Sequence, residues 1–323
     1  MSYDLSSWKG KHVISVKPLT KQNCEEVIYV AEKMRDLVAK QGGSDILHHR
    51  ILANVFLEPS TRTASSFATA FMRLGGKVVS VGADTSSTKK GETLQDTMRC
   101  VQCYADCIVL RHPMTGAASI ASKYLEKPFL NAGDGAGEHP SQALLDLVTI
   151  NKEIGHIEGI TVTMVGDLLY GRTVHSLARL LAFYNVKLNY VAPNKLQMPD
   201  EVYNEVAAKG IQQHKTEVLS DDILAETDIL YVTRVQQERF ESQEEYKKYH
   251  GVYIIGPDTL AKCKSTVRVM HPLPRIGEIL ESIDHMPQAA FFREMENGMF
   301  TRMALISLVM GVAEDVVKEV DAL

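Results

Sequence analysis

The sequence has 323 residues, of which 45% are hydrophobic and 23% are charged. This length and composition are typical of a globular protein with about two domains. The 35 basic residues are outnumbered by 40 acidic ones, and no basic stripe with interleaved aromatic residues is present, which excludes the usual electrostatic footprint of a nucleic-acid binder.

The N-terminal sequence and the number of cysteines indicate the cellular compartment that we expect for this protein. The first residues, MSYDLSSWKGK, lack the basic and apolar regions of a secretory signal, and no apolar run reaches the length of a membrane span. Five cysteines are an odd number, which argues against a disulfide framework. We therefore expect a cytoplasmic protein with reduced thiols and no membrane association. Cys100, Cys103 and Cys107 lie on a helical pattern that runs into a strand, so we expect them to pack in the core and not to bind a metal.

Apolar strands and amphipathic helices alternate along the first half of the chain, which is typical of an α/β fold with a parallel sheet. The predicted elements are helices over 21–40, 92–104, 117–124 and 139–154, and strands over 51–57, 77–81, 107–110 and 128–131. A further helix follows the first of these strands, and its apolar residues recur on one face that includes Phe67, Phe71 and Met72. We expect that face to be buried.

The turn between the strand over 51–57 and this helix, in the segment VFLEPSTRT, predicts an anion cradle. A helix N-terminus presents unpaired N–H groups and a positive dipole. Hydroxyls of Ser60, Thr61 and Thr63 and the guanidinium of Arg62 add further donors at this point. Together these groups suit a phosphate. An ordinary Ser/Thr N-cap with a solvated arginine is the alternative that the turn alone leaves open.

Polar segments follow the next strands. Residues 82–91 are too polar to pack in a core, so they form either a solvated loop or a flexible arm that carries a cation to an anionic ligand. Arg111 comes directly after the strand over 107–110, and a glycine-rich loop leads from the strand over 128–131 to His139. Because open α/β sheets bind ligands at the carboxyl ends of their strands, we expect these side chains to be functional.

A second α/β unit begins after the glycines at 155 and 159, which mark a boundary. Its predicted elements are strands over 160–165, 187–192, 228–232 and 267–270, a helix after residue 171 and a helix over 201–208. A final helix over 294–323 is expected to pack back on the first unit. Residues 237–248 have little apolar content and predict a mobile segment or an exposed helix. The turn His271-Pro272-Leu273-Pro274-Arg275 is stiffened by two prolines, which suits backbone carbonyls that orient a small ligand.

Arginines follow two strands of this second unit. The loop over 166–173 has the glycine spacing of a nucleotide P-loop, but Arg172 replaces the lysine, which favours carboxylate capture over nucleotide binding. Arg234 and Gln236 follow the strand over 228–232. Two guanidinium forks suit a ligand with two carboxylates.

Taken together, these motifs resemble the catalytic chains of aspartate carbamoyltransferases, within the aspartate/ornithine carbamoyltransferase family. The matching segments are Ser60-Thr61-Arg62-Thr63, Lys89-Lys90-Gly91-Glu92, Arg111-His112-Pro113, the loop over 131–142, Val165-Gly166-Asp167, Gly171-Arg172-Thr173, Thr233-Arg234-Val235-Gln236 and the turn over 271–275. The resemblance covers nearly the whole chain in the family order. It implies two doubly wound parallel-sheet domains with the active site between them. A carbamoyl phosphate-binding domain over 1–154 would be completed by the C-terminal helix over 294–323, and an aspartate-binding domain would span 155–293.

The resemblance also implies the activity. The carbamoyl group of carbamoyl phosphate would pass to L-aspartate, giving N-carbamoyl-L-aspartate and phosphate, in de novo pyrimidine (UMP) biosynthesis. No metal or organic cofactor is required. The expected assembly is a homotrimer with shared active sites, associated with other pyrimidine-pathway enzymes.

Individual roles carry over from the resemblance. Ser60, Thr61, Arg62 and Thr63 would hold the phosphate, with Ser86 and Lys90 contributed by a neighbouring chain. Thr63, Arg111 and His139 would donate to the carbonyl oxygen, where negative charge grows. Gln142 and the Leu273 carbonyl, in the turn that Pro272 stiffens, would bind the carbamoyl NH2. Arg172, Arg234 and Gln236 would bind the aspartate carboxylates.

Ornithine carbamoyltransferase, or another carbamoyltransferase with a different amine acceptor, is the nearest alternative. Its pattern carries a basic residue and a cysteine where this sequence has Ala64 and Pro272. A dehydrogenase is disfavoured because no Gly-x-Gly-x-x-Gly follows the first strand of either unit. A catalytically silent subunit is disfavoured because every matched residue is present. One departure from the bacterial pattern is Leu169, where a lysine is common.

Overall fold

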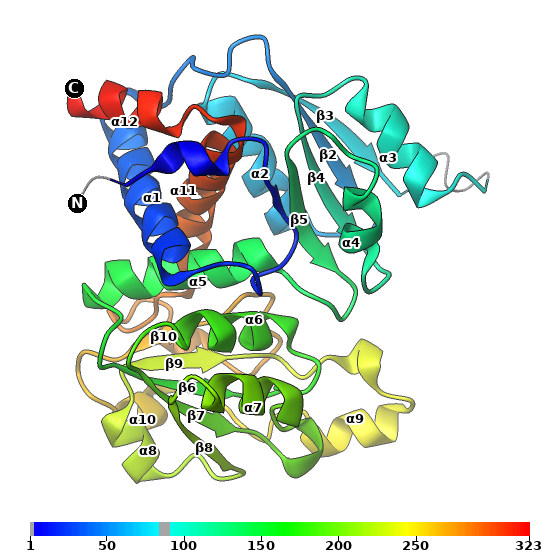
Figure 1. Cartoon of the computed structure of the whole chain (residues 1–323). Helices are drawn as coiled ribbons and strands as arrows, with labels where there is room; N and C mark the ends of the chain where they lie inside the picture. The colour runs from blue at the N-terminus through cyan, green and yellow to red at the C-terminus, as the bar shows by residue number, and fades with distance from the viewer. Residues whose placement is uncertain (1–2, 84–90) are drawn as a thin grey trace. The chain divides into compact units, whose positions relative to one another are not determined.

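The computed structural model describes residues 3–83 and 91–323. The chain forms two compact units: the first comprises Met1–Val148 and Glu296–Leu323, and the second comprises Thr149–Met295. Each unit contains a five-stranded parallel sheet with helices on both faces (Figure 1). The predicted α/β class with two doubly wound parallel sheets is confirmed. No helix among the described residues combines the length and apolar character needed to cross a bilayer.

The sheet of the first unit has the strand order β1-β5-β4-β2-β3. The strands are β1 (His12–Val13), β5 (Phe129–Asp134), β4 (Cys107–His112), β2 (Ile51–Phe56) and β3 (Lys77–Gly82). The central strands are apolar without alternation because helices cover both faces of the sheet. The chain leaves β2 for β3 on one side and then returns across β2 to β4. The carboxyl ends of β2 and β4 therefore flank the point where the strand order reverses.

Helices α3 and α4 lie on one face of this sheet, and α2 lies on the other with α1 and α11 beside it (Figure 1). The helices of this unit are α1 (Lys21–Gln41), α2 (Thr61–Arg73), α3 (Leu94–Gln102), α4 (Ala117–Ser122), the start of α5 (Pro140–Ile154), most of α11 (Phe291–Met310), α12 (Ala313–Asp321) and the 3-10 turn η1 (Leu5–Trp8). Local sequence sets the ends of α1. A capping box of Thr20 and Asn23 begins it, and Gly42, with φ 87°, ends it.

The sheet of the second unit has the order β10-β9-β6-β7-β8. Its strands are β6 (Thr161–Val165), β7 (Lys187–Val191), β8 (Gln212–Thr216), β9 (Ile229–Val232) and β10 (Arg268–Met270). Its helices are α6 (Arg172–Leu181), α7 (Asp200–Ala207), α8 (Asp221–Glu226), α9 (Gln243–Tyr249) and α10 (Pro257–Leu260), with the 3-10 turns η3 (Asn194–Leu196), η4 (Gln237–Arg239) and η5 (Glu281–Ile283). The strand order reverses between β6 and β9, so their carboxyl ends lie together.

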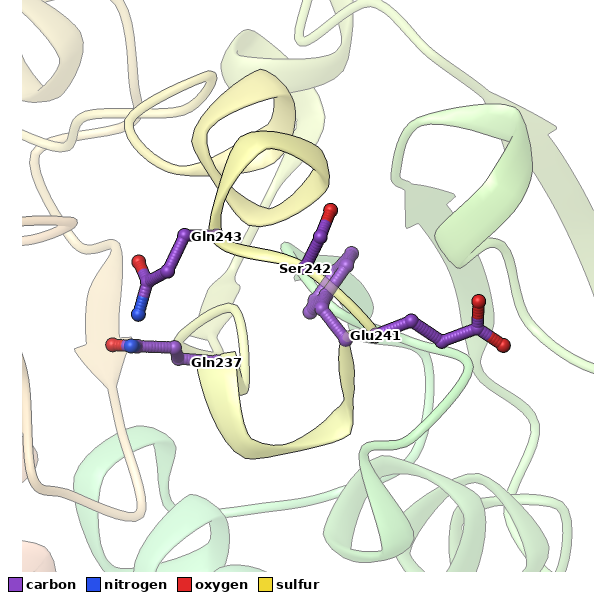
Figure 2. Close-up of a pocket in the computed structure, with 5 residues that line it drawn as sticks. Gln237, Glu241, Ser242 and Gln243 are labelled. Carbon is purple, nitrogen blue, oxygen red and sulfur yellow. The ribbon is translucent and has the colours of Figure 1, made fainter.

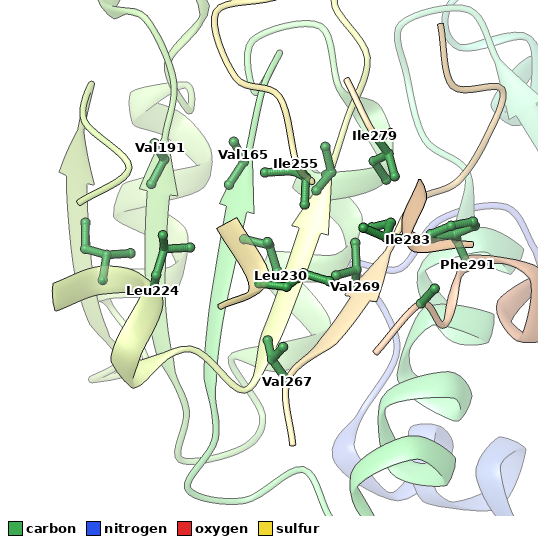
Figure 3. Close-up of a cluster of buried hydrophobic side chains, with 14 residues drawn as sticks. Val165, Val191, Leu224, Leu230, Ile255, Val267, Val269, Ile279, Ile283 and Phe291 are labelled. Atoms are coloured by element: carbon green, nitrogen blue, oxygen red, sulfur yellow. The ribbon is translucent and has the colours of Figure 1, made fainter. Parts of the chain in front are cut away.

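A buried apolar cluster holds one face of this second sheet. Val165, Leu230 and Val269 point from neighbouring strands toward Leu224 of α8 and Ile283 of η5 (Figure 3). These side chains are between 0% and 3% exposed. Such close packing holds in place the strands from which the polar loops extend.

Several predictions about individual elements are wrong. The C-terminal helix is not continuous, because Gly311, with φ 72°, separates α11 from α12. Strand β8 was not predicted; its sequence, QQHKT, is polar because it lies at a sheet edge. Cys100 and Cys103 are exposed and do not pack in the core, whereas Cys107 is buried. Met72 is 55% exposed.

Candidate active site

The predicted anion cradle lies at the start of α2. Ser60 is the N-cap residue in an extended conformation, and its side chain makes no capping hydrogen bond to the helix. The donors of the first turn are therefore not satisfied by the Ser60 hydroxyl. The side chain of Arg62 is exposed, and that of Thr63 is buried within the first unit. This helix N-terminus follows the carboxyl end of β2, at the reversal of strand order.

Arg111 reaches the same edge of the sheet from the end of β4. Its Nε lies 3.1 Å from Glu58 Oε2, and its Nη1 donates to the Ala132 carbonyl at 3.3 Å. Burial lowers the pKa of Arg111, and the Glu58 carboxylate opposes that shift. Because Glu58 belongs to the loop that begins α2, this ion pair fixes the guanidinium beside the cradle. The sequence motif contained Glu58, but no role was predicted for it.

The glycine-rich loop after β5 has a defined shape. Asp134 accepts hydrogen bonds from the backbone N–H of Gly116 at 3.0 Å and of Glu138 at 2.9 Å. A side chain at Gly135 would meet the Pro113 carbonyl at 2.4 Å, so a close backbone approach requires glycine there. The loop is thereby held against the segment that follows β4, and it delivers His139 to the start of α5.

His139 and Gln142 are both buried in the first unit, 4% and 6% exposed. The Ser141 hydroxyl lies 3.3 Å from His139 Nδ1. Gln142 Nε2 donates to Asp146 Oδ1 at 2.9 Å, one helical turn further along α5. The structure thus places the predicted residues of α2, β4 and α5 in one unit, at the carboxyl edge of its sheet or on the helix that follows β5.

In the second unit, the loops after β6 and β9 are bonded to each other. Gly166 has φ 118°, and a side chain there would meet the Thr233 carbonyl at 2.2 Å. Asp167 accepts from the backbone N–H of Tyr170 at 2.9 Å and of Gln236 at 3.4 Å. Burial raises the pKa of Asp167, and these backbone donors oppose the shift. Asp167 therefore connects the loop that carries Arg172 to the segment that carries Arg234.

Gln236 and Arg234 are placed by these connections. Gln236 Nε2 donates to the Tyr170 carbonyl at 3.0 Å, which directs its amide toward the loop before α6. Arg234 is close enough to act electrostatically on both Asp167 and His271. Arg172 begins α6. All three predicted carboxylate-binding residues thus follow the two strands at which the order of this sheet reverses.

The turn after β10 is organised around His271. Its Nδ1 accepts from the Leu273 N–H at 2.7 Å, and its Nε2 lies 2.7 Å from Glu278 Oε1. Burial lowers the pKa of His271, and Glu278 opposes the shift. Because one ring nitrogen accepts, the other must donate to the carboxylate. This arrangement holds Leu273 at φ 53° beside Pro272.

Residues 237–248 form the turn η4 and most of helix α9, and neither was given definite bounds by the sequence. Phe240 packs edge-on against Tyr170, with ring centroids 6.5 Å apart, and against Tyr246 at 5.9 Å. A hollow of about 470 Å³ is lined by Gln237, Phe240, Glu241, Ser242 and Gln243; the amides of Gln237 and Gln243 face each other across it (Figure 2). No predicted site residue lines this hollow.

Two predicted residues, Ser86 and Lys90, lie outside the described residues. Within the described ranges, no group of three or more His, Cys, Asp or Glu side chains is arranged to hold a metal ion. The supporting carboxylates Asp134, Asp146 and Glu278 were not singled out by the sequence, because each acts on a partner that local patterns do not reveal.

Comparison with known proteins identifies both halves of the chain. A family model described as "Aspartate/ornithine carbamoyltransferase, carbamoyl-P binding domain" matches residues 11–152, and one described as "Aspartate/ornithine carbamoyltransferase, Asp/Orn binding domain" matches residues 158–309. A structure of aspartate transcarbamoylase from Trypanosoma cruzi in complex with carbamoyl phosphate is similar with a TM-score of 0.90 and 40% identity, and the match covers 95% of this chain and 98% of that one.

Curated relatives agree. The aspartate carbamoyltransferase catalytic subunit of Thermococcus onnurineus is 46% identical over 308 residues, which are 95% of this chain and 99% of that protein. Multifunctional protein pyr1-3 of Dictyostelium discoideum is 51% identical over 306 residues, but the chain spans only 14% of its length. The resemblance found in the motifs is confirmed, and the chain belongs to the aspartate/ornithine carbamoyltransferase family.

Proposed function

We propose that this protein transfers the carbamoyl group of carbamoyl phosphate to L-aspartate, giving N-carbamoyl-L-aspartate and phosphate in pyrimidine biosynthesis. One observation carries the proposal: in each sheet, predicted ligand arginines follow or end the two strands at which the strand order reverses, Arg62 and Arg111 in the first sheet and Arg172 and Arg234 in the second. The first unit is assigned to carbamoyl phosphate and the second to aspartate. Similarity to a Trypanosoma cruzi aspartate transcarbamoylase solved with carbamoyl phosphate and aspartate supports this assignment.

The chemistry follows from the donors of the first unit. The N-terminus of α2, with Ser60, Thr61, Arg62 and Thr63, binds the phosphate. The amine of aspartate attacks the carbonyl carbon, and the oxygen of the resulting tetrahedral species gains negative charge. Thr63, Arg111 and His139 donate to that oxygen. The bond from carbon to the phosphate oxygen then breaks, and the departing phosphate accepts the proton of the amine.

The residues that recognise the carbamoyl group are assigned from the family resemblance. Gln142 and the carbonyl of Leu273, beside Pro272, are assigned to the carbamoyl NH2. Gln142 is buried and its Nε2 donates to Asp146, so its amide oxygen is the group assigned to accept from that NH2.

Aspartate is favoured over ornithine as the acceptor because the second unit offers two arginines. Arg172 and Arg234 both follow strands at the reversal point, where Gln236 is bonded to the same loop. Guanidinium forks bind carboxylates in pairs of hydrogen bonds, whereas the cationic side chain of ornithine would be repelled. The test supplies carbamoyl phosphate with either amino acid and measures the carbamoylated product. Carbamoylation of ornithine in preference to aspartate would contradict the proposal.

We further propose a homotrimer in which Ser86 and Lys90 complete the phosphate site of a neighbouring chain; this assignment comes from the family resemblance. Mixing Lys90→Ala with Arg62→Ala chains after reversible dissociation tests it. Random reassembly yields about three-quarters mixed trimers, each with one intact site in three, so roughly a quarter of wild-type activity should return. If mixed trimers form without recovery, Lys90 does not act across the interface.

We also propose that the protein acts in the cytoplasm, together with other enzymes of pyrimidine synthesis. The five cysteines are all free thiols, as a reducing compartment favours. Similarity to one region of multifunctional relatives supports association with further enzymes. Co-purification of the endogenous protein, followed by mass spectrometry of its partners, tests this association.

A further inference from the structure

A buried arginine of the first unit is not among the predicted ligand residues. Arg302, on α11, is 4% exposed, and its Nη1 donates to the Ser66 hydroxyl of α2 at 2.9 Å. Its guanidinium carbon lies 5.1 Å from the centroid of the Phe67 ring. Burial lowers the pKa of Arg302 to about 10, and the nearby carboxylate of Asp146 opposes that shift. The guanidinium therefore remains charged at neutral pH and compensates a fully buried carboxylate.

The backbone of α11 makes room for this group. A side chain at Gly298 would lie 2.8 Å from Arg302 Nη1 and 3.2 Å from Leu145 Cδ2. Glycine at this position lets the guanidinium fold over its own helix and lie beside α5. A charged side chain enclosed this closely has few other conformations, so Arg302 is a fixed point between α2 and α5.

Asp146 interacts with both Arg302 and Gln142, and its hydrogen bond to Gln142 orients the Gln142 amide. The amide of a glutamine can present either its oxygen or its NH2 to a ligand, and the two orientations have nearly the same shape. An ionised carboxylate only accepts hydrogen bonds, so the 2.9 Å contact with Asp146 selects the orientation in which Nε2 faces Asp146. The Gln142 oxygen is then directed away from Asp146.

We propose that Asp146 and Arg302 are positioning residues that hold the Gln142 amide with its oxygen toward the NH2 of the carbamoyl group. Arg302 is close enough to act electrostatically on Asp146, and a carboxylate at Asp146 excludes the flipped amide because it can only accept. The same guanidinium bonds Ser66, one turn beyond the cradle of α2. Arg302 and Asp146 therefore fix the position of the Gln142 amide oxygen relative to α2, the helix assigned to the phosphate. This inference rests on the proposed function.

The test compares two ligands that differ only at the group to which Gln142 is proposed to hydrogen-bond. Carbamoyl phosphate has an NH2 where acetyl phosphate has a methyl group, and both have the same phosphate. Calorimetry gives the ratio of their dissociation constants. In the wild type we expect carbamoyl phosphate to bind about tenfold more tightly, the range for one hydrogen bond to a buried group.

Asp146→Asn is the decisive variant because it keeps the size of the side chain but can donate as well as accept. Gln142 is then free to turn its NH2 toward the ligand, so the ratio should fall to within about twofold of one. General damage to the fold would weaken both ligands equally and leave the ratio unchanged. Arg302→Lys, which keeps the charge but not the fork, should give an intermediate ratio and serves as a second variant if Asp146→Asn does not fold.

Glu26→Gln is the matched control. Glu26 is fully buried in the same unit and accepts from Trp8, Gln22 and Asn23, none of which is a predicted site residue. Its replacement should leave the ligand ratio at the wild-type value. An unchanged ratio in both Asp146→Asn and Arg302→Lys, in a wild type that carbamoylates aspartate, overturns the positioning role alone. A wild type that neither binds carbamoyl phosphate nor carbamoylates aspartate overturns the proposed function itself.

Discussion

Replacing Gly166 by alanine should separate the functions of the two units. The added methyl would lie 2.2 Å from the Thr233 carbonyl oxygen, at a backbone φ of 118° that other residues rarely adopt. The loop after β6 must then move away from the segment after β9. Since these segments carry Arg172 and Arg234, we expect weaker aspartate binding while carbamoyl phosphate binding in the other unit is retained.

The magnitude has two parts. Adopting an unfavourable positive φ costs about 1–2 kcal/mol, and an overlap that forces a backbone shift costs about 1–3 kcal/mol more. Gly210→Ala isolates the first part, because Gly210 also has a positive φ, of 79°, but no atom lies within 4 Å of the added methyl. Gly166→Ala should therefore lower the free energy of unfolding by about 1–3 kcal/mol more than Gly210→Ala does.

Urea unfolding measures the two stabilities, and steady-state kinetics measures KM for aspartate. We expect KM to rise at least tenfold in Gly166→Ala and to stay at the wild-type value in Gly210→Ala. Calorimetry with carbamoyl phosphate should give the wild-type affinity for both variants. Equal stabilities together with an unchanged KM would refute the argument that the close contact of Gly166 with Thr233 sets the aspartate site.

Three further results are expected. Arg62→Ala should lower activity at least a hundredfold with little change in thermal stability, because its side chain is exposed and is assigned to the phosphate; loss of stability with turnover retained would make it structural. Glu58→Gln should lower kcat roughly tenfold by releasing Arg111, whereas Glu205→Gln, which breaks an ion pair elsewhere, should not. Burial lowers the pKa of His175, so the unfolded chain binds its proton more readily; the free energy of unfolding should fall as the pH drops below about 6.5, and less steeply in His175→Gln.

The sequence was sufficient to place the carboxyl ends of the central strands to within about three residues, because their signals are local. An apolar run followed directly by Gly166 predicts both where β6 lies and where it stops, whereas β4 continues two residues past its apolar run, through Arg111 to His112. Edge elements give no such signal: β8 is polar because one side of it faces solvent, so no apolar run marks it. The break at Gly311 was missed because the apolar pattern continues across it.

The residues that orient the site were missed for a different reason. Arg302 contacts Ser66 across 236 positions of sequence, and no periodicity connects such a pair. A buried charge on an apolar helix is visible in the sequence only as an exception to the pattern of α11. That exception was the available signal, and it indicates that a buried partner must exist without identifying it.

A chain with a formal net charge of -5 is proposed to bind two anions, and four carboxylates near the predicted site residues explain how this is achieved. Glu58 lies against Arg111, Asp146 accepts from a glutamine, Asp167 accepts two backbone N–H groups, and Glu278 accepts from an imidazole. In each case the carboxylate can only accept, so it fixes the orientation of the donor that it contacts. We infer that these acidic residues do not oppose anion binding, because each carboxylate interacts with a neighbouring hydrogen-bond donor. That interaction orients the donor before the substrate binds. Preorganised donors of this kind stabilise charge that develops during reaction more effectively than solvated cations do. The arrangement predicts that neutralising any one of these carboxylates lowers kcat or substrate affinity even though the local net charge becomes more favourable to an anion.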